Sequence, residues 1–264
     1  MDLGREPKTG AITKRNRATE QSLRIATYNV HGCRGTDRRR SEYRIAEVIA
    51  LLDVDVIGLQ ELDLNRRRSG RVDQAAVIAE RLGWHCYFYP AFRARDEQFG
   101  NAILSRYPMR LRQAAELPSV MTRVCPESRA AIWMEIDTPN GAVQVMNTHL
   151  GLGRRERLTQ AQLLAGPKWV GRLATDDALI LLGDFNSLPG SPPLKLLGQH
   201  LRATRTLLAA SSRLATFPTR SPLLALDHIF VNGRLRVNSV TVFRNEVARV
   251  ASDHFPLVAD VRLA

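Results

Sequence analysis

The chain contains little cysteine and very little lysine. Its 264 residues include three cysteines, Cys33, Cys86 and Cys125, which are odd in number and widely spaced. This pattern excludes a disulfide framework and the close cysteine pairs of a zinc knuckle, so we expect free thiols and a cytoplasmic, reducing location. Only four lysines contribute to the net charge of +12, so arginine supplies nearly all of it. Such a charge favours polyanions or anionic surfaces as partners, although an arginine-rich composition alone would give the same total.

Long apolar runs are also missing. No run reaches the ~18 residues of a membrane span, and the first residues lack the apolar core of a signal peptide. Residues 1–22 are polar and without periodicity, so we expect a disordered tail. Residues 23–264 are long enough for one domain with a substantial core, which we expect to be a monomer.

Short apolar runs that end in turn residues predict a chain rich in strands. Helical spacing is confined to 42–52, 72–82 and 155–173, and we expect an irregularity at Gly166-Pro167 in the last of these. The Asn140-Gly141 pair predicts a hairpin. Because hairpins occur and strands outnumber helices, the expected fold is a mixed-sheet α/β domain of packed layers. The expected strands cover 23–30, 54–59, 84–89, 102–105, 130–137, 142–149, 178–182, 226–231, 236–243 and 256–263.

The segment 178–193, ALILLGDFNSLPGSPP, places polar residues directly after a buried strand. Asp184 and Asn186 are two residues apart, so strand alternation points both side chains to the same side. A carboxylate directly after an apolar run is costly unless it is paired or functional. The alternative is that both residues only cap the turn before a helix that starts near Ser191.

Similar polar residues recur at the other expected strand ends. If these ends share one rim, the carboxylates would repel one another unless a cation lies among them. Oxygen ligands without cysteine suit Mg²⁺, Mn²⁺ or Ca²⁺. The residues are Asn29, Glu61, Asn101, His149, Asp184 with Asn186, Asp227, and Asp253 with His254.

Seven motifs occur in order over residues 23–263: TYNVHG, GLQELD, GNAILS, MNTHLG, LLGDFNSLPGSP, LDHIFV and SDHFPLVADV. They resemble the motifs of the endonuclease/exonuclease/phosphatase superfamily, which includes deoxyribonuclease I, apurinic endonucleases, neutral sphingomyelinases and inositol-polyphosphate 5-phosphatases. The resemblance implies a four-layer α/β/β/α sandwich of two mixed β-sheets with the site at one edge. It also implies hydrolysis of a phosphate ester with Mg²⁺ (or Mn²⁺).

The resemblance implies a metal site and a water-activating group. Glu61 would ligate the metal, with Asn29 beside it holding metal or phosphate, and Asp253 would be a second carboxylate near the metal. Asp184 would orient or deprotonate the attacking water. Asn186 would donate to a phosphate oxygen.

Two histidines complete the implied site. His254 would contact the phosphoryl oxygens or assist the leaving group, held in one tautomer by Asp227. His149 would be a second phosphate-contacting histidine, and Asn101 would line the phosphate pocket. Arg129 would contact substrate, with a structural salt bridge as the alternative. The other histidines, including His31 and His228, are interpreted as structural.

Arginine clusters adjoin several of these strand ends. If the strands end at one rim, the arginines surround the site, and Arg68 would bind substrate. A cationic collar suits nucleic acid or the headgroups of an anionic lipid surface. The clusters are Arg34 with Arg38 to Arg40, Arg66 to Arg68 with Arg71, Arg93 with Arg95, and Arg154, Arg155 and Arg157.

The sequence favours a nuclease-like phosphodiesterase and leaves alternatives open. A phospholipid, sphingomyelin-type or inositol-phosphate phosphoesterase would also suit the motifs, since no aromatic residues interleave the arginine clusters. TYNVHGC and RSGRVDQ look more like bacterial hydrolases of this superfamily than dedicated repair enzymes. A non-catalytic protein that binds anionic ligands is the competing class.

Overall fold

The computed structural model describes residues 22–119, 128–173, 177–207 and 214–264. The expected disordered tail, residues 1–22, lies outside this part of the chain except for Ser22, where the first strand begins. Cys125 also lies outside it, whereas Cys33 and Cys86 are free thiols, as expected. In the described part, no helix is long and apolar enough to cross a membrane.

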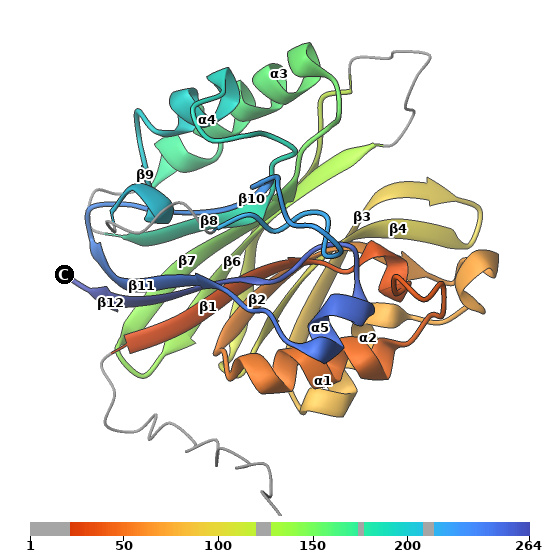
Figure 1. Cartoon of the computed structure of the whole chain (residues 1–264). Helices are drawn as coiled ribbons and strands as arrows, with labels where there is room; N and C mark the ends of the chain where they lie inside the picture. Colours follow the sequence, from red (N-terminus) through yellow and green to blue (C-terminus); the bar gives the residue numbers. More distant parts are fainter. Residues whose placement is uncertain (1–21, 120–127, 174–176, 208–213) are drawn as a thin grey trace, which may run out of the picture.

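Six strands form the first sheet, in the spatial order β11-β12-β1-β2-β4-β3 (Figure 1). Strands β1 and β2 are parallel, and every other neighbouring pair is antiparallel. The strands are β1 (Ser22–Asn29), β2 (Val56–Leu64), β3 (His85–Ala94), β4 (Glu97–Ser105), β11 (Leu235–Val242) and β12 (Leu257–Leu263).

Six further strands form the second sheet, in the order β5-β6-β7-β8-β10-β9. Here β7 and β8 are the parallel pair. The predicted hairpin at Asn140-Gly141 joins β6 to β7, with Thr138 paired to Gly141. The strands are β5 (Met109–Leu117), β6 (Arg129–Thr138), β7 (Gly141–His149), β8 (Ala178–Asp184), β9 (Arg202–Ala203) and β10 (Asp227–Val231).

Three hydrophobic clusters separate four layers, which confirms the expected α/β/β/α sandwich. One cluster packs helices against the outer face of the first sheet, one fills the space between the sheets, and one lies under the helices of the second sheet. The helices are α1 (Glu42–Leu52), α2 (Gln74–Leu82) and α5 (Glu246–Ala251) on the first sheet, and α3 (Arg154–Ala165) and α4 (Pro192–Leu197) on the second.

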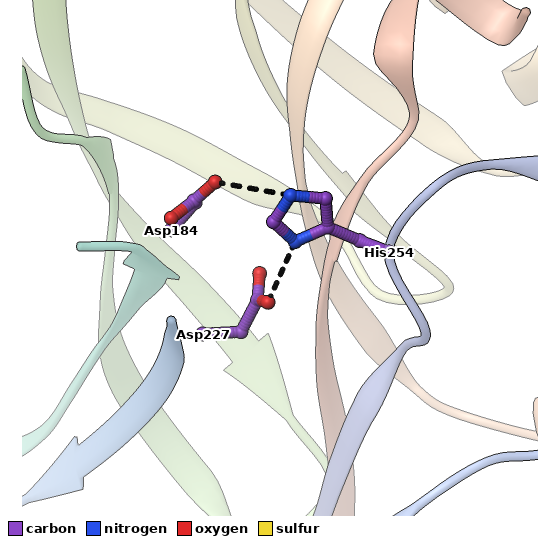
Figure 2. Close-up of side chains that lie close together, drawn as sticks. All are labelled: Asp184, Asp227 and His254. Atoms are coloured by element: carbon purple, nitrogen blue, oxygen red, sulfur yellow. Dashed lines mark hydrogen bonds and ion pairs between the residues drawn. The ribbon is translucent and has the colours of Figure 1, made fainter. Parts of the chain in front are cut away.

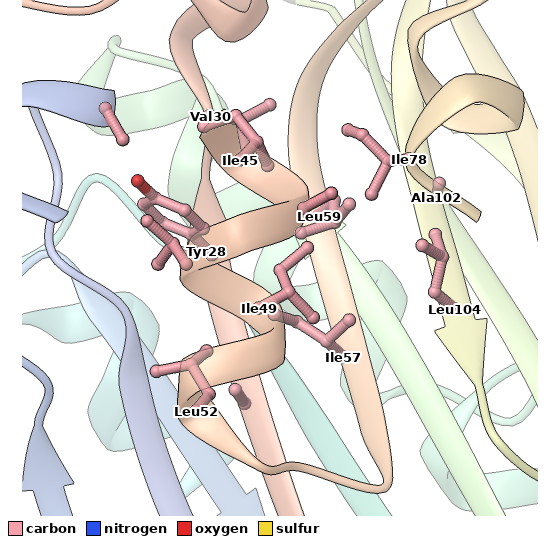
Figure 3. Packing of buried hydrophobic residues seen from close by; sticks show 14 of the residues in the cluster. Tyr28, Val30, Ile45, Ile49, Leu52, Ile57, Leu59, Ile78, Ala102 and Leu104 are labelled. Carbon is pink, nitrogen blue, oxygen red and sulfur yellow. The ribbon is translucent and has the colours of Figure 1, made fainter. Parts of the chain in front are cut away.

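Helix α1 shows how the sequence forms the outer layer. Ser41 caps it, because its side chain accepts a hydrogen bond from the backbone N–H of Arg44. Ile45 and Ile49 recur at helical spacing and pack on the first sheet (Figure 3). Each fully buried side chain of this size contributes about 1.5–3 kcal/mol.

Several elements differ from the sequence-based prediction, among them β3 and β4, which run on to Ala94 and begin at Glu97, respectively. Strand β2 runs on to Leu64 instead of ending at residue 59, and the expected helix over 155–173 ends at Ala165, because Gly166 and Pro167 follow. Strands β5 and β9 and helix α5 are not among the predicted elements. Strand β5 is an edge strand with a largely exposed surface, so its sequence has no continuous apolar run.

Candidate active site

Three neighbouring strands of the second sheet place three predicted residues side by side. In the register, Asp184 at the end of β8 pairs with His149 at the end of β7 and with Asp227 at the start of β10. Asn29, at the end of β1 in the first sheet, donates a hydrogen bond from Nδ2 to Asp184 Oδ2 over 3.0 Å. The predicted site therefore spans one common edge of both sheets.

Gly183 allows the close approach of strands that this edge needs. Its φ is +152°, and a Cβ atom there would lie 1.9 Å from the carbonyl oxygen of Thr148 in β7. An L side chain at this position would therefore clash with backbone. The next residue, Asp184, is held beside β7, and its carbonyl accepts from the N–H of Leu150 over 2.9 Å.

The Asp184 carboxylate is buried and surrounded by polar groups. Its Oδ1 accepts from the backbone N–H of Asn186 over 2.9 Å, and its Oδ2 lies 3.6 Å from His149 Nε2 and 3.7 Å from His254 Nε2. Burial and the charge of Asp227 raise the pKa of Asp184 to about 7. A carboxylate that titrates near neutral pH can take a proton from water.

His254 lies between two carboxylates (Figure 2). Its Nδ1 donates to Asp227 Oδ2 over 2.9 Å, and its ring packs on Phe217 with centroids 4.7 Å apart. Burial lowers the pKa of His254, but the charges of Asp227 and Asp184 outweigh burial and raise the pKa to about 10. The imidazole is therefore protonated at neutral pH and can donate from Nε2.

His149 has the opposite protonation state. Burial, together with the positive charges of Arg129 and His254, lowers its pKa well below the usual 6.5. The Nδ1 atom of His149 lies 3.2 Å from Arg129 Nη1, which can only donate. The Nε2 atom lies 3.1 Å from the Asn186 amide nitrogen, which also can only donate, so the neutral ring accepts from one of these two neighbours.

A β-bulge places Glu61. Strand β2 pairs Leu59 with Ala102 and Leu62 with Gly100, so Gln60 and Glu61 together stand opposite one residue of β4, Asn101. Glu61 has a positive φ of 61°, and its Oε1 accepts from Asn29 Nδ2 over 2.8 Å. The prediction that Glu61 and Asn101 terminate strands is wrong: both lie inside strands, at this bulge.

The donor set at Glu61 fits a divalent cation. Among the described residues no arginine, lysine or histidine forms an ion pair with this half-buried carboxylate, so no protein cation neutralises its charge. Asp253 is also half-buried, and its Oδ2 lies 3.7 Å from His31 Nδ1. Glu61, Asn29 and Asp253 would hold the ion through the oxygen donors that Mg²⁺ prefers.

Asp184, Asp227 and His254 also lie close enough to one another to hold an ion. The Nδ1 atom of His254 is already bonded to Asp227, and the raised pKa keeps the ring protonated. A protonated imidazole has no lone pair for a metal. The raised pKa of His254 therefore makes this group less suited to bind an ion than the oxygen donors at Glu61.

The three residues expected to contact substrate, Asn101, Arg129 and Arg68, differ in burial and in hydrogen-bond partners. Asn101 is buried and donates from Nδ2 to the carbonyl of Ala130 over 3.0 Å, which ties β4 to β6. Arg129 is also buried and faces His149. Arg68 binds the buried Asp63 with two hydrogen bonds of 2.9 and 2.7 Å, and its side chain is 45% exposed.

The structure adds residues that the sequence interpretation passed over. Ser252 donates to the carbonyl of Asn29 over 2.8 Å, so it fixes the β1 end beside the SDH segment. Thr216 donates to Asp227 Oδ2 over 2.5 Å. The position of Ser252 in the SDH motif could have indicated its role from the sequence. Thr216 lies outside the strands and helices, and no sequence pattern pointed to it. His31, interpreted as structural, lies beside Asp253, while His228 is buried against the Ser187 carbonyl.

Comparison with known proteins finds relatives that match most of the chain. The chain is 29% identical over 256 residues to the protein YbhP of Escherichia coli (strain K12), covering 92% of this chain and 97% of YbhP. Its fold is similar to that of an endonuclease/exonuclease/phosphatase from Beutenbergia cavernae, with a TM-score of 0.75, 23% identity and coverage of 93% of this chain and 72% of that one.

A second solved structure has a similar fold, the mannosyl-6-phosphatase Bt3783 of Bacteroides thetaiotaomicron. The TM-score is 0.69 at 21% identity, and the match covers 90% of this chain and 99% of that one. The sequence description of the Endonuclease/Exonuclease/phosphatase family matches residues 26–254, which include every residue placed at the site above. The chain belongs to the endonuclease/exonuclease/phosphatase family, whose members hydrolyse phosphate esters.

Proposed function

We propose that the protein is a divalent-metal-dependent phosphodiesterase that hydrolyses a P–O bond with an activated water. We propose that it is nuclease-like, with nucleic acid as its substrate. The observation that carries the proposal is the pairing of Asp184 with His254. Their Oδ2 and Nε2 atoms are 3.7 Å apart, and their pKa values are raised to about 7 and about 10. A carboxylate that can accept a proton thus lies beside an imidazolium that can donate one.

The reaction needs a positioned water, neutralised phosphate charge and help for the leaving oxygen. Asp184 would orient the water and accept its proton at Oδ2. His254, held by Asp227 through Nδ1, would donate from Nε2 to a phosphoryl oxygen or to the leaving oxygen. A general base of this kind contributes about 10²–10⁴-fold to the rate.

Two more side chains would hold the phosphate. His149 is neutral, and the Asn186 amide nitrogen lies 3.1 Å from its Nε2 atom and donates to the Leu150 carbonyl over 2.8 Å. His149 Nε2 lies 3.6 Å from Asp184 Oδ2, and the two side chains together would bind nonbridging oxygens beside it. A Mg²⁺ or Mn²⁺ ion bound by Glu61, Asn29 and Asp253 would supply neutralisation of the phosphate charge.

A neighbouring cavity supports a polyanionic substrate. It has a volume of about 250 Å³ and adjoins the site, because His31 and Asp253 are among its lining residues. Arg34, Arg38 and Arg220 also line it, and all three are exposed. Further phosphates on either side of the scissile bond would meet these cations, which favours nucleic acid.

A test of hydrolysis uses bis(p-nitrophenyl) phosphate with Mg²⁺ or Mn²⁺. The wild-type protein should release p-nitrophenol, and Asp184→Ala should lose at least about 10²-fold of the turnover. Asp137→Asn is the matched control, because Asp137 is exposed at the end of the β6–β7 hairpin. Unchanged turnover in Asp184→Ala would overturn the mechanism, and an inactive wild-type protein would favour a non-catalytic anion-binding protein.

The substrate is tested by comparing plasmid DNA, sphingomyelin, inositol phosphates and a sugar phosphate in the same buffer. The sugar phosphate is included because the structurally similar Bt3783 is a mannosyl-6-phosphatase. We expect DNA cleavage that weakens as salt increases, since phosphate contacts release counterions. Inactivity on DNA at low salt, with activity on another ester, would exclude the nuclease assignment and keep the hydrolase.

A further inference from the structure

A second cavity lies on the helix-covered side of the second sheet. Its volume is about 340 Å³, which is in the range of ~300–1,000 Å³ typical of small-molecule sites. Its walls come from α4, from β9 with the turn that follows it, and from β10. These elements lie together at one side of the molecule (Figure 1). Leu194, Leu201 and Phe230 give it an apolar surface.

A buried arginine lines this cavity. Arg205 is 8% exposed, and the hydrogen bond that its guanidinium makes in the described part of the chain runs from Nη2 to the carbonyl of Leu214 over 3.4 Å. In that part no carboxylate lies within ion-pair distance of Arg205. Residues 208–213, LAASSR, include no acidic side chain. Burial lowers the pKa of Arg205, and the charge of Asp227 offsets this only in part, so a guanidinium with no carboxylate in contact gains from a bound anion.

The other charged groups around the cavity are also positive. Lys195 of α4 is exposed, and Arg202 of β9 is fixed by donating to the carbonyls of Asn232 and Leu235. No aspartate or glutamate is among the described lining residues. His228 adds no charge, because burial and the nearby Arg205 lower its pKa to about 4. The neutral ring donates from Nε2 to the Ser187 carbonyl over 2.8 Å.

We propose that this cavity is a binding site for an amphipathic anion with a short apolar chain and a single carboxylate or phosphate head. The head would bind Arg205, with Lys195 at the entrance. The chain would lie against the apolar residues of α4 and β10. The site is distinct from the proposed phosphoesterase site, whose Asp184, Asp227 and His254 contact one another and are not among the lining residues.

Direct binding measurements test whether the site recognises both the anionic head and the apolar chain, without an activity assay. Isothermal titration calorimetry would use octanoate and octyl phosphate, below their aggregation concentrations, as the amphipathic anions. Octanol supplies the chain without charge, and inorganic phosphate supplies charge without the chain. We expect saturable binding with one site for the two anions, and binding about tenfold weaker or absent for the other two probes.

Variants locate the binding. Ala203→Phe should abolish it, because Ala203 lines the cavity and the larger ring fills it. Arg205→Met should weaken it about tenfold or more, and Arg205→Lys should retain part of it. Lys168→Gln is the matched control, since Lys168 is an exposed lysine outside the lining.

Several results would overturn the proposal. If octanol binds as tightly as octyl phosphate, the site does not recognise an anion. If inorganic phosphate binds as tightly as octyl phosphate, the site does not recognise an apolar chain. Binding that survives Ala203→Phe, in a variant with wild-type circular dichroism, would place the ligand elsewhere on the cationic surface. If Arg205→Met does not fold, Ala203→Phe and the four probes still decide the outcome.

Discussion

His254 donates a hydrogen bond from Nδ1 to Oδ2 of Asp227 over 2.9 Å, and both side chains are buried. The same oxygen accepts the hydroxyl of Thr216. The carboxylate therefore fixes the ring orientation, favours the imidazolium and leaves Nε2 directed at Asp184. The acid role proposed for His254 depends on this contact.

Replacing Asp227 by asparagine should move the alkaline limb of the rate profile. In the wild-type protein His254, with its pKa near 10, stays protonated up to about pH 10. Asp227→Asn removes the charge that raises this pKa, so turnover should begin to fall at lower pH. The profile of kcat against pH with bis(p-nitrophenyl) phosphate measures the change.

The matched variant for this experiment is Asp137→Asn, which removes an equal charge at the exposed end of the β6–β7 hairpin. Its profile should overlay that of the wild-type protein. If Asp227→Asn also leaves the alkaline limb in place, the contact between Asp227 and His254 does not control the proton of His254.

The same pair should make stability depend on pH. The folded-state pKa of His254, about 10, lies above its usual value of 6.5, so the folded state binds the proton more tightly than the unfolded state. The stabilisation is fully present below pH 6.5 and is lost as pH rises toward 10. Denaturant titrations with a chelator present should show the free energy of unfolding falling across this range.

His254→Gln isolates this contribution. The difference in unfolding free energy between wild type and variant should shrink as pH rises from 6.5 to 10. A difference that stays constant over that range would show that His254 has the same proton affinity in both states.

Glu61→Gln should weaken metal binding while leaving the stability of the fold largely unchanged. The amide keeps the shape of the side chain but removes the charge proposed to bind the ion. We expect the Mg²⁺ or Mn²⁺ concentration for half-maximal activity to rise by about tenfold or more. Glu116→Gln changes an exposed glutamate of β5 and serves as the control. Equal metal dependence in both variants would exclude Glu61 as a ligand.

Gly183→Ala should destabilise the protein, because the new methyl group would lie 1.9 Å from the Thr148 carbonyl oxygen. We expect a loss of about 2 kcal/mol or more in unfolding free energy, since β7 and β8 must separate. Gly190→Ala is the control: Gly190 also has a positive φ, +80°, but nothing lies within 4 Å of an added Cβ. Equal losses in the two variants would attribute the effect to backbone strain and not to strand spacing.

Much of the fold could be predicted from local patterns. The run before Asp184, the Asn140-Gly141 turn and the spacing of Ile45 and Ile49 each define an element through a few neighbouring residues. Strand β5 could not be found in this way, because an edge strand with an exposed face does not need an apolar run. The helix end at Ala165 was signalled by the proline that follows.

The sequence by itself determined that most candidate site residues lie at strand ends, Glu61 and Asn101 excepted, because period-two alternation and turn residues act over short distances. The contacts between those ends were decided by the tertiary structure. The β2 bulge turns Glu61 toward Asn29, Gly183 lets β8 approach β7, and Thr216 fixes Asp227 from a loop. Register, bulges and burial depend on strands far apart in the chain, and these same contacts set the opposite proton affinities of His149 and His254.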